Sequence, residues 1–256
     1  MARKIVLTGG KGGVGKTTVA ANLGASLTRK GARVLICDAD FGLNNVDVVC
    51  GIEDLSTYDL VDVIEGRCRA KQALVRHPEF CNLYVLPSNR SMPERYVSPQ
   101  ALKVVLDGLA DGFDYVLIDS PDGLEEGFHR AASCAEEALV VTTPHLTALR
   151  DADKATALLR SYGFKAINLV VNRVRGDRIL TGECLSPKEI ATLLNLPLIG
   201  VLPESDRLEV GAFTGGGVPF KALANNVAGG KLRMIDPTRQ YTGVWGGVKR
   251  ILRKSL

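Results

Sequence analysis

The sequence predicts an α/β protein with a single doubly wound, mainly parallel sheet and helices on both faces. Short apolar runs rich in β-branched residues alternate along the chain with segments long enough to form helices, which is the pattern of this fold class. Most of these runs are continuous rather than alternating, as expected of strands that are buried on both faces. With 256 residues, of which 46% are hydrophobic and 23% charged, the chain is long enough to bury one large core.

Seven apolar runs are expected to form the strands, and four longer segments between them are expected to form helices. The strands are expected at residues 4–8, 33–37, 83–86, 115–118, 139–143, 168–171 and 198–202. The helices are expected at residues 17–30, 99–110, 148–161 and 187–194. The last helix has the clearest start, because Ser186 is followed by Pro187 at the first helical position and by Glu189 in the first turn. The glycine-rich stretch 211–217 is expected to be a loop.

Nothing in the sequence indicates export or a membrane span. No apolar run reaches the roughly 20 residues needed to cross a bilayer, and the N-terminal residues enter a strand-like stretch without a signal peptide. The six cysteines are scattered, with no CxxC pair and no Cys/His cluster at zinc spacing, so we expect reduced thiols. The expected localisation is the cytoplasm.

A glycine-rich motif follows the first expected strand and leads directly into a helix. It fits the P-loop pattern G-x-x-x-x-G-K-[ST] and reads Gly10-Lys11-Gly12-Gly13-Val14-Gly15-Lys16-Thr17-Thr18. The glycines allow backbone N–H groups to converge on phosphate oxygens, and the helix N-terminus adds a favourable dipole. Lys16 is expected to reach the β- and γ-phosphates of a nucleotide, and the Thr17 hydroxyl is expected to hold Mg²⁺. The sequence therefore predicts a P-loop NTPase fold.

Three aspartates follow two of the expected strands. Asp38 and Asp40 come after the strand at 33–37, and Asp119 ends the strand at 115–118. The carboxyl ends of parallel strands meet at one edge of the sheet, so all three are expected beside the P-loop. Carboxylates there hold Mg²⁺ through water or orient an attacking water. Asp38, Asp40 and Asp119 are therefore candidates for the metal site or for the water-orienting catalytic residue, and their position alone does not divide these roles among them.

The P-loop motif, with its additional Lys11, resembles the deviant Walker A motif of the ParA/MinD family of P-loop ATPases. Further blocks at residues 38–47, 114–127, 141–153 and 195–204 narrow the resemblance to the MinD branch, the cell-division site-selection ATPases. The resemblance extends from residue 2 to about residue 220. It implies an ATP hydrolase that uses Mg²⁺ and helps to place the septum, with MinC-like and MinE-like regulators. It also implies a homodimer formed on ATP binding, in which Lys11 of each subunit reaches the phosphates of the other, as an arginine finger does.

The resemblance assigns further roles to individual residues. It implies that Asp40 positions the attacking water and that Asp119 contacts Mg²⁺ through water. It also implies that Asn172 and the backbone of Pro203 and Glu204 contact adenine. The residues taken by themselves predict only the phosphate site, and they do not distinguish ATP from GTP.

Two positions depart from the family pattern. Asp122 stands where the family usually has alanine, after the Ser-Pro that follows the aspartate Asp119. Its charge lies near the expected γ-phosphate, so our hypothesis is that it slows hydrolysis or alters dimer contacts by repelling phosphate; the alternative is a side chain that points to solvent. His145 stands where an acidic residue is usual, and we interpret it as an ordinary surface residue.

The C-terminus is expected to be a membrane-targeting helix. At 100° per residue, residues 242–256 place apolar side chains on one face and basic side chains on the other. The residues expected to contact the membrane are Val244, Trp245, Val248, Lys249, Arg250, Ile251, Leu252, Arg253, Lys254 and Leu256. The MinD family also ends in such a helix. We therefore expect an ATPase domain at 1–226, a flexible linker at 227–241 and a helix at 242–256 that binds the anionic inner face of the cell membrane.

The charge distribution separates this interpretation from its alternatives. Residues 231–256 hold seven basic residues and one acidic residue, which leaves a formal charge of −2 for the rest of a chain whose total is +4. A ParA-like DNA-segregation ATPase needs basic residues on the folded body, so we predict no specific nucleic-acid partner. A MinD-like flagellar-number regulator would share the site and the tail and stays an alternative. A nitrogenase-type iron protein is disfavoured because no cysteine lies between Asp119 and Arg130.

Overall fold

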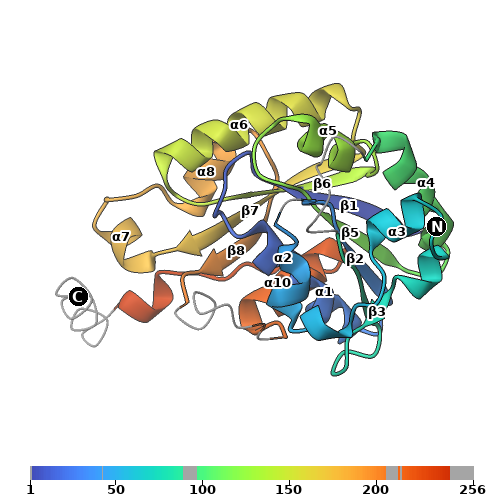
Figure 1. Ribbon diagram of the computed structural model, residues 1–256. Coiled ribbons are helices and arrows are strands. Elements are labelled where there is room, and N and C mark those ends of the chain that lie inside the picture. The colour runs from blue at the N-terminus through green and yellow to red at the C-terminus, as the bar shows by residue number, and fades with distance from the viewer. Residues whose placement is uncertain (1, 42, 89–96, 206–212, 214, 243–256) are drawn as a thin grey trace.

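The computed structural model describes residues 2–41, 43–88, 97–205, 213 and 215–242. Its sheet has eight strands in the order β3-β4-β2-β5-β1-β6-β7-β8 (Figure 1). Neighbouring strands pair in parallel except for β3 and β4, which are antiparallel. The predicted α/β class with one mainly parallel sheet is therefore confirmed.

All seven expected strands occur, each within three residues of its expected bounds. The strands are β1 Arg3–Thr8, β2 Val34–Asp38, β3 Val75–Arg76, β4 Leu83–Leu86, β5 Tyr115–Asp119, β6 Glu137–Thr142, β7 Ala166–Val174 and β8 Leu198–Pro203. The additional strand β3 has two residues and pairs at the sheet edge. So short a strand carries no periodic pattern that the sequence could reveal.

All four expected helices also occur, within two residues of their expected bounds, together with shorter helices that were not expected. The helices are α1 Lys16–Thr28, α2 Asn45–Cys50, α3 Leu60–Ile64, α4 Pro99–Ala110, α5 Glu126–Ala132, α6 Leu146–Ser161, α7 Gly176–Leu180, α8 Pro187–Leu194 and α10 Val218–Val227. Among the described residues, short 3₁₀ turns occur at η1 Glu53–Leu55, η2 Ala70–Gln72 and η4 Arg239–Tyr241. Four of the unexpected helices have five to seven residues, too few turns for a clear apolar stripe. The fifth, α10, has ten residues and buries Phe220, Leu223, Ala224 and Val227 on one face, a stripe that the sequence reading missed.

Two apolar cores lie on the two faces of the sheet. Successive side chains of β1 point to opposite faces: Val6 belongs to the core under α3, α4, α5, α6 and α8, whereas Ile5 and Leu7 belong to the core over α1, α2 and α10. Figure 1 shows the two helix layers on either side of the sheet. Burial on both faces explains why the strand sequences are continuously apolar.

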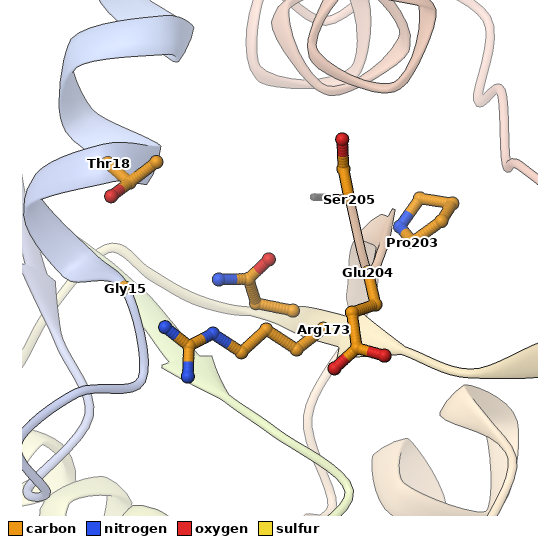
Figure 2. Close-up of a pocket in the computed structure, with 7 residues that line it drawn as sticks. Gly15, Thr18, Arg173, Pro203, Glu204 and Ser205 are labelled. Carbon is orange, nitrogen blue, oxygen red and sulfur yellow. The ribbon is translucent and has the colours of Figure 1, made fainter. Parts of the chain in front are cut away.

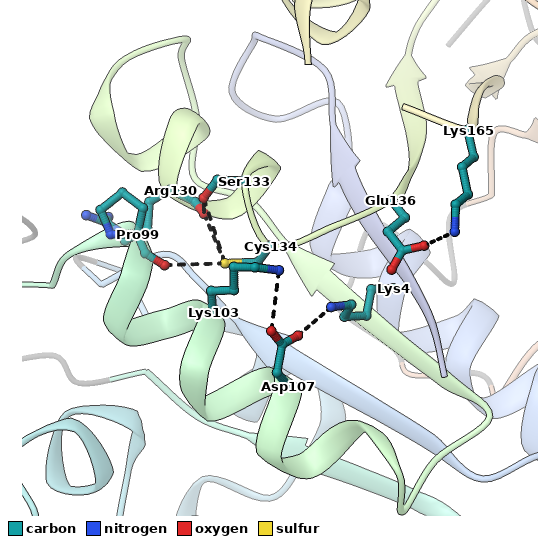
Figure 3. A network of polar contacts seen from close by, with 9 residues as sticks. All are labelled: Lys4, Pro99, Lys103, Asp107, Arg130, Ser133, Cys134, Glu136 and Lys165. Atoms are coloured by element: carbon teal, nitrogen blue, oxygen red, sulfur yellow. Dashed lines mark hydrogen bonds and ion pairs between the residues drawn. The ribbon is translucent and has the colours of Figure 1, made fainter. Parts of the chain in front are cut away.

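A buried lysine ties helix α4 to the first strand. Lys4 of β1 is 8% exposed, and its Nζ donates to Oδ1 of Asp107 on α4 at 2.5 Å. Lys103, one turn earlier on α4, lies 3.4 Å from the other oxygen of Asp107 (Figure 3). Burial raises the pKa of Asp107, but the hydrogen bonds and charges of Lys4 and Lys103 outweigh it and lower that pKa. The contact holds α4 against the central strand β1.

The segment after α10, expected to be a flexible linker, makes specific contacts with the domain. The Asn226 amide donates to the carbonyl oxygens of Ile199 at 2.8 Å and Arg233 at 2.7 Å, and it accepts from the Arg233 N–H at 2.8 Å. Farther along, Tyr241 is buried at 3% exposure. The Asn225 amide also donates to the carbonyl oxygen of Lys231 at 2.7 Å. Two adjacent asparagines therefore bond to the returning chain, which a loss of periodicity in the sequence does not reveal.

The expected membrane helix lies, from residue 243 onward, outside the described residues. Every residue expected to contact the membrane, from Val244 to Leu256, falls in that stretch. In the part of the chain that is described, no helix is long and apolar enough to cross a bilayer.

Candidate nucleotide-binding site

The predicted P-loop lies between β1 and α1, at the carboxyl edge of the sheet. Gly15 directly precedes α1 and has φ 93°, a left-handed conformation that favours glycine. A Cβ at this position would lie 2.5 Å from Nδ2 of Asn172, so the loop also needs the missing side chain for space. The Asn172 Nδ2 donates to the carbonyl oxygen of Val14 at 2.9 Å. Strand β7 thereby holds the P-loop from the side.

The two functional side chains at the start of α1 point into a cavity of about 280 Å³. Among its lining residues are the P-loop members Gly13, Gly15, Lys16, Thr17 and Thr18, together with Asp40, Ser120 and Asp122. Lys16 is 6% exposed and its Nζ donates to Oδ1 of Asp122. The Thr17 hydroxyl donates to Oδ2 of Asp119 at 2.6 Å. The structure therefore brings the predicted Lys16, Thr17 and Asp40 to one cavity, and Asp119 is hydrogen-bonded to Thr17.

Asp119 has the environment of a metal-site residue. It is 2% exposed, and its Oδ1 is buried with no hydrogen-bond partner among the described residues. Burial raises its pKa to about 7, opposed by the hydrogen bond from Thr17 and the charge of Lys16. A buried carboxylate oxygen without a partner is costly, and carboxylate and hydroxyl oxygens are ligands that Mg²⁺ prefers. The site thus fits a magnesium ion.

The protein offers too few groups to hold such an ion alone. No cluster of three or more His, Cys, Asp or Glu side chains in the described ranges is arranged to bind a metal. In P-loop proteins the remaining ligands are phosphate oxygens and water. The geometry therefore fits a metal that arrives with a nucleotide.

Asp38 faces the loop that carries Asp40. Its Oδ1 accepts the Asp40 N–H at 2.9 Å and its Oδ2 accepts the Val46 N–H at 3.2 Å. Asp40 itself is partly exposed and lines the same cavity as Lys16. Asp38 therefore holds the backbone that presents Asp40, a positioning contact that its place at a strand end did not reveal.

The predicted base contacts form a separate small pocket. Asn172, Pro203 and Glu204 line it together with the P-loop residues Gly15 and Thr18 (Figure 2). Asn172 is 7% exposed, and its Nδ2 is already used in the hydrogen bond to Val14. The three expected residues are thus together and adjoin the phosphate site.

Arg173 is a residue that the sequence did not point to. It lines the base pocket, the phosphate cavity and a larger pocket of about 600 Å³ that also includes His145 and Thr147. Its side chain extends from β7 toward Gly15 (Figure 2). Its φ is 52°, which is uncommon for a residue with a side chain, and β7 and β8 lose regular register there. The only available signal was its position beside Asn172, because a positive φ at arginine leaves no mark in sequence.

Lys11 points away from the cavity of its own subunit. Its Nζ donates to Oγ1 of Thr147, near the start of α6, at 2.5 Å. The neighbouring Gly10 has φ 69° and lies against the backbone of Asp151 on the same helix. His145, the residue before α6, is exposed, as expected of a surface residue.

Comparisons with known proteins agree with this geometry. A family model described as an AAA domain matches residues 2–162. The septum site-determining protein MinD of Thermotoga maritima is 43% identical over 228 residues, 88% of this chain and 83% of the relative. A chain of the MinC:MinD cell division protein complex from Aquifex aeolicus superposes with a TM-score of 0.83 at 33% identity, covering 91% of this chain and 98% of that one. The septum site-determining protein MinD of Pyrococcus horikoshii, complexed with Mg-ADP, gives 0.79 at 31% identity, covering 89% and 96%.

Proposed function

The chain belongs to the MinD family of septum site-determining cell-division ATPases, and we propose that it binds ATP with Mg²⁺ in the cavity above the P-loop. The convergence of Lys16, Thr17 and Asp40 on that cavity, with Asp119 hydrogen-bonded to Thr17, is the observation that carries the proposal. The relative from Pyrococcus horikoshii, complexed with Mg-ADP, supports the choice of ligand. The base pocket of Asn172, Pro203 and Glu204 would take adenine.

The side chains have distinct roles in the proposed hydrolysis. Backbone N–H groups from Gly10 to Thr18 would hold the phosphates, and Lys16 would stabilise charge on the β- and γ-phosphates. Thr17 and Asp119 would hold Mg²⁺, which neutralises phosphate charge when bound. Asp40 would accept a hydrogen bond from the attacking water and orient it. Asp38 supports this geometry through its bonds to the backbone of Asp40 and Val46.

Lys11 would act on the nucleotide of a second subunit. Its ammonium contacts Thr147 on α6 rather than its own phosphate cavity, which leaves it on an accessible face. An ATP-dependent homodimer would bring this charge to the partner's γ-phosphate. A cation supplied in this way contributes on the order of 10³-fold or more to turnover.

The regulators follow from the family. The Aquifex aeolicus relative is part of a MinC:MinD complex, so we propose a MinC-like protein as a partner of this chain. A MinE-like regulator is proposed on the family resemblance alone. We further propose that the chain acts at the inner face of the cell membrane, with residues 1–226 as the ATPase domain and 227–241 as the connection to the tail.

The membrane switch would reside in residues 242–256. Four basic side chains near an anionic surface contribute about 1 kcal/mol each, but a single short helix is marginal in water. Two tails linked by an ATP-bound dimer gain about 10²-fold or more in effective affinity. ATP would therefore favour the membrane-bound state, and hydrolysis would release it.

The test is co-sedimentation with anionic vesicles in ATP, ADP or no nucleotide, using the full chain and a chain that ends at Tyr241. ATP-dependent binding that is lost on truncation and weakened by salt supports the proposal. Binding to duplex DNA is measured in parallel. Nucleotide-dependent DNA binding without vesicle binding would instead indicate a ParA-like segregation ATPase.

A further inference from the structure

The loop between β5 and α5 places a carboxylate directly over the P-loop. Asp122, three residues after Asp119, accepts a hydrogen bond from Nζ of Lys16 through its Oδ1. Its Oδ2 lies so near Gly12 that a Cβ added there would be 2.5 Å from it. Asp122 and Lys16 line the same cavity. A negative charge of the protein therefore occupies the part of the P-loop to which phosphate is expected to bind.

The surroundings of the two charges differ. The Lys16 side chain is 6% exposed, whereas that of Asp122 is 49% exposed. An ammonium group removed from water needs a partner, so the carboxylate stabilises Lys16 in the nucleotide-free protein. Its exposure gives the carboxylate solvent to move into when a stronger anion takes its place.

The residues on either side of Asp122 have restricted or unusual backbone conformations. On one side, Pro121 restricts φ and follows Ser120, which is buried. On the other side, Gly123 has φ 84°, a conformation that lacks a steric penalty only for glycine. Helix α5 begins three residues later, at Glu126.

We propose that Asp122 is an internal anion that holds Lys16 in the nucleotide-free protein and exchanges places with the terminal phosphates when a nucleotide binds. This proposal rests on the proposed function of the site. Lys16 meets the β- and γ-phosphates, and two anions held at one ammonium repel each other. The exchange makes binding depend on phosphate number, because AMP has no phosphate that competes for Lys16.

Nucleotide titrations test the exchange. The parent, Asp122→Ala and Asp122→Asn are titrated with ATP, ADP and AMP in Mg²⁺ by calorimetry. ATP should bind both variants about three- to tenfold more tightly, the range of a partly exposed ion pair. The gain should be smaller for ADP and absent for AMP. Glu126→Gln is the matched control, since it removes an exposed acidic charge at the start of the next helix and should change none of the three affinities.

The stability of the nucleotide-free protein separates exchange from simple repulsion. If Asp122 partners Lys16, Asp122→Ala lowers the melting temperature without nucleotide by about 2–4 °C. Asp122→Asn should lower it less, because its amide oxygen still accepts from Nζ. An aspartate that only repelled bound phosphate would weaken ATP binding without stabilising the free protein.

Each outcome bears on the proposal. Equal ATP affinities of parent and variants overturn it, as does an equal gain for AMP or for Glu126→Gln. Tighter ATP binding without a lower melting temperature also overturns it in favour of repulsion. The proposed function is judged separately, because it requires that the parent binds Mg-ATP and that Lys16→Met does not, whatever Asp122 does.

Discussion

Asp38 and Asp119 stand opposite each other in the parallel register of β2 and β5, at the sheet edge beside the P-loop. Both carboxyl groups are buried. Burial raises the pKa of Asp119 to about 7, and the charges of Asp40 and Asp122 add to the increase. The pKa of Asp38 is raised by burial and then by the charge of Asp119. A bound cation would therefore stabilise the two carboxylates. Without a cation, a proton on one of the carboxyl groups reduces their repulsion.

The first prediction is that the metal-free protein loses stability as the pH rises from about 4 to about 7. In this window the folded protein keeps a proton on Asp119 that the unfolded chain has released, so a higher pH favours unfolding. Asp119 contributes about 4 kcal/mol to this loss at most, the free energy of its pKa difference, and Asp38, whose pKa is also raised, adds to it. Urea unfolding across this window, in EDTA and without nucleotide, measures it. Asp119→Asn should make the dependence shallower, since only Asp38 then keeps a proton in the folded protein, and an equally steep fall in that variant would contradict the assignment.

The second prediction separates backbone strain from contact in the P-loop. Gly15 and Gly31 have nearly the same φ, 93° and 92°, but a Cβ at Gly15 would meet Asn172 whereas a Cβ at Gly31 meets nothing within 4 Å. Gly31→Ala should cost only the left-handed conformation, about 1 kcal/mol. Gly15→Ala should cost about 1–3 kcal/mol more and weaken ATP binding. Chemical denaturation measures the stability, and nucleotide titration measures the ATP affinity. Equal losses of stability in the two variants would show that the contact with Asn172 does not contribute to the cost.

The sequence predicted where the aspartates of this site lie, because short-range patterns determine where the strands end. Asp38, Asp40 and Asp119 were expected together since each follows a buried apolar run, and parallel strands end at one edge. The pairing of Lys16 with Asp122 could not be predicted, because it depends on the path of the loop after β5. The contact between Asn226 and Arg233 depends in the same way on a chain reversal. Such contacts join residues that no periodic pattern relates.

The third prediction concerns Arg173, whose side chain lies between the base pocket and the phosphate cavity. Arg173→Ala and Arg173→Gly both remove the guanidinium, so both should weaken ATP binding by a similar factor, about three- to tenfold. Because φ is 52°, the glycine variant should be more stable than the alanine variant by about 1 kcal/mol. Calorimetric titration and thermal unfolding measure the two effects. If both variants bound ATP as tightly as the parent, Arg173 would have a structural role only.

The last prediction is that Lys11 is needed for turnover and not for binding. Its Nζ lies 2.5 Å from Oγ1 of Thr147, away from Lys16, so Lys11→Ala should keep its ATP affinity within about twofold while turnover falls by about 10³-fold. Lys154→Ala, which removes an exposed lysine from α6, is the matched control and should change neither quantity. If Lys11→Ala lost ATP affinity by as large a factor as turnover, Lys11 would contact the nucleotide bound to its own subunit.

Mixing two inactive variants decides between the subunits. Asp40→Asn lacks the residue proposed to orient water but keeps Lys11, whereas Lys11→Ala keeps Asp40. In a mixed dimer, the Lys11→Ala subunit has its own Asp40 and receives Lys11 from the Asp40→Asn subunit, so one of the two sites is complete. Steady-state assays of such mixtures should therefore recover turnover that neither variant shows alone. If each lysine served its own nucleotide, no site in the mixed dimer would be complete and the mixture would stay inactive.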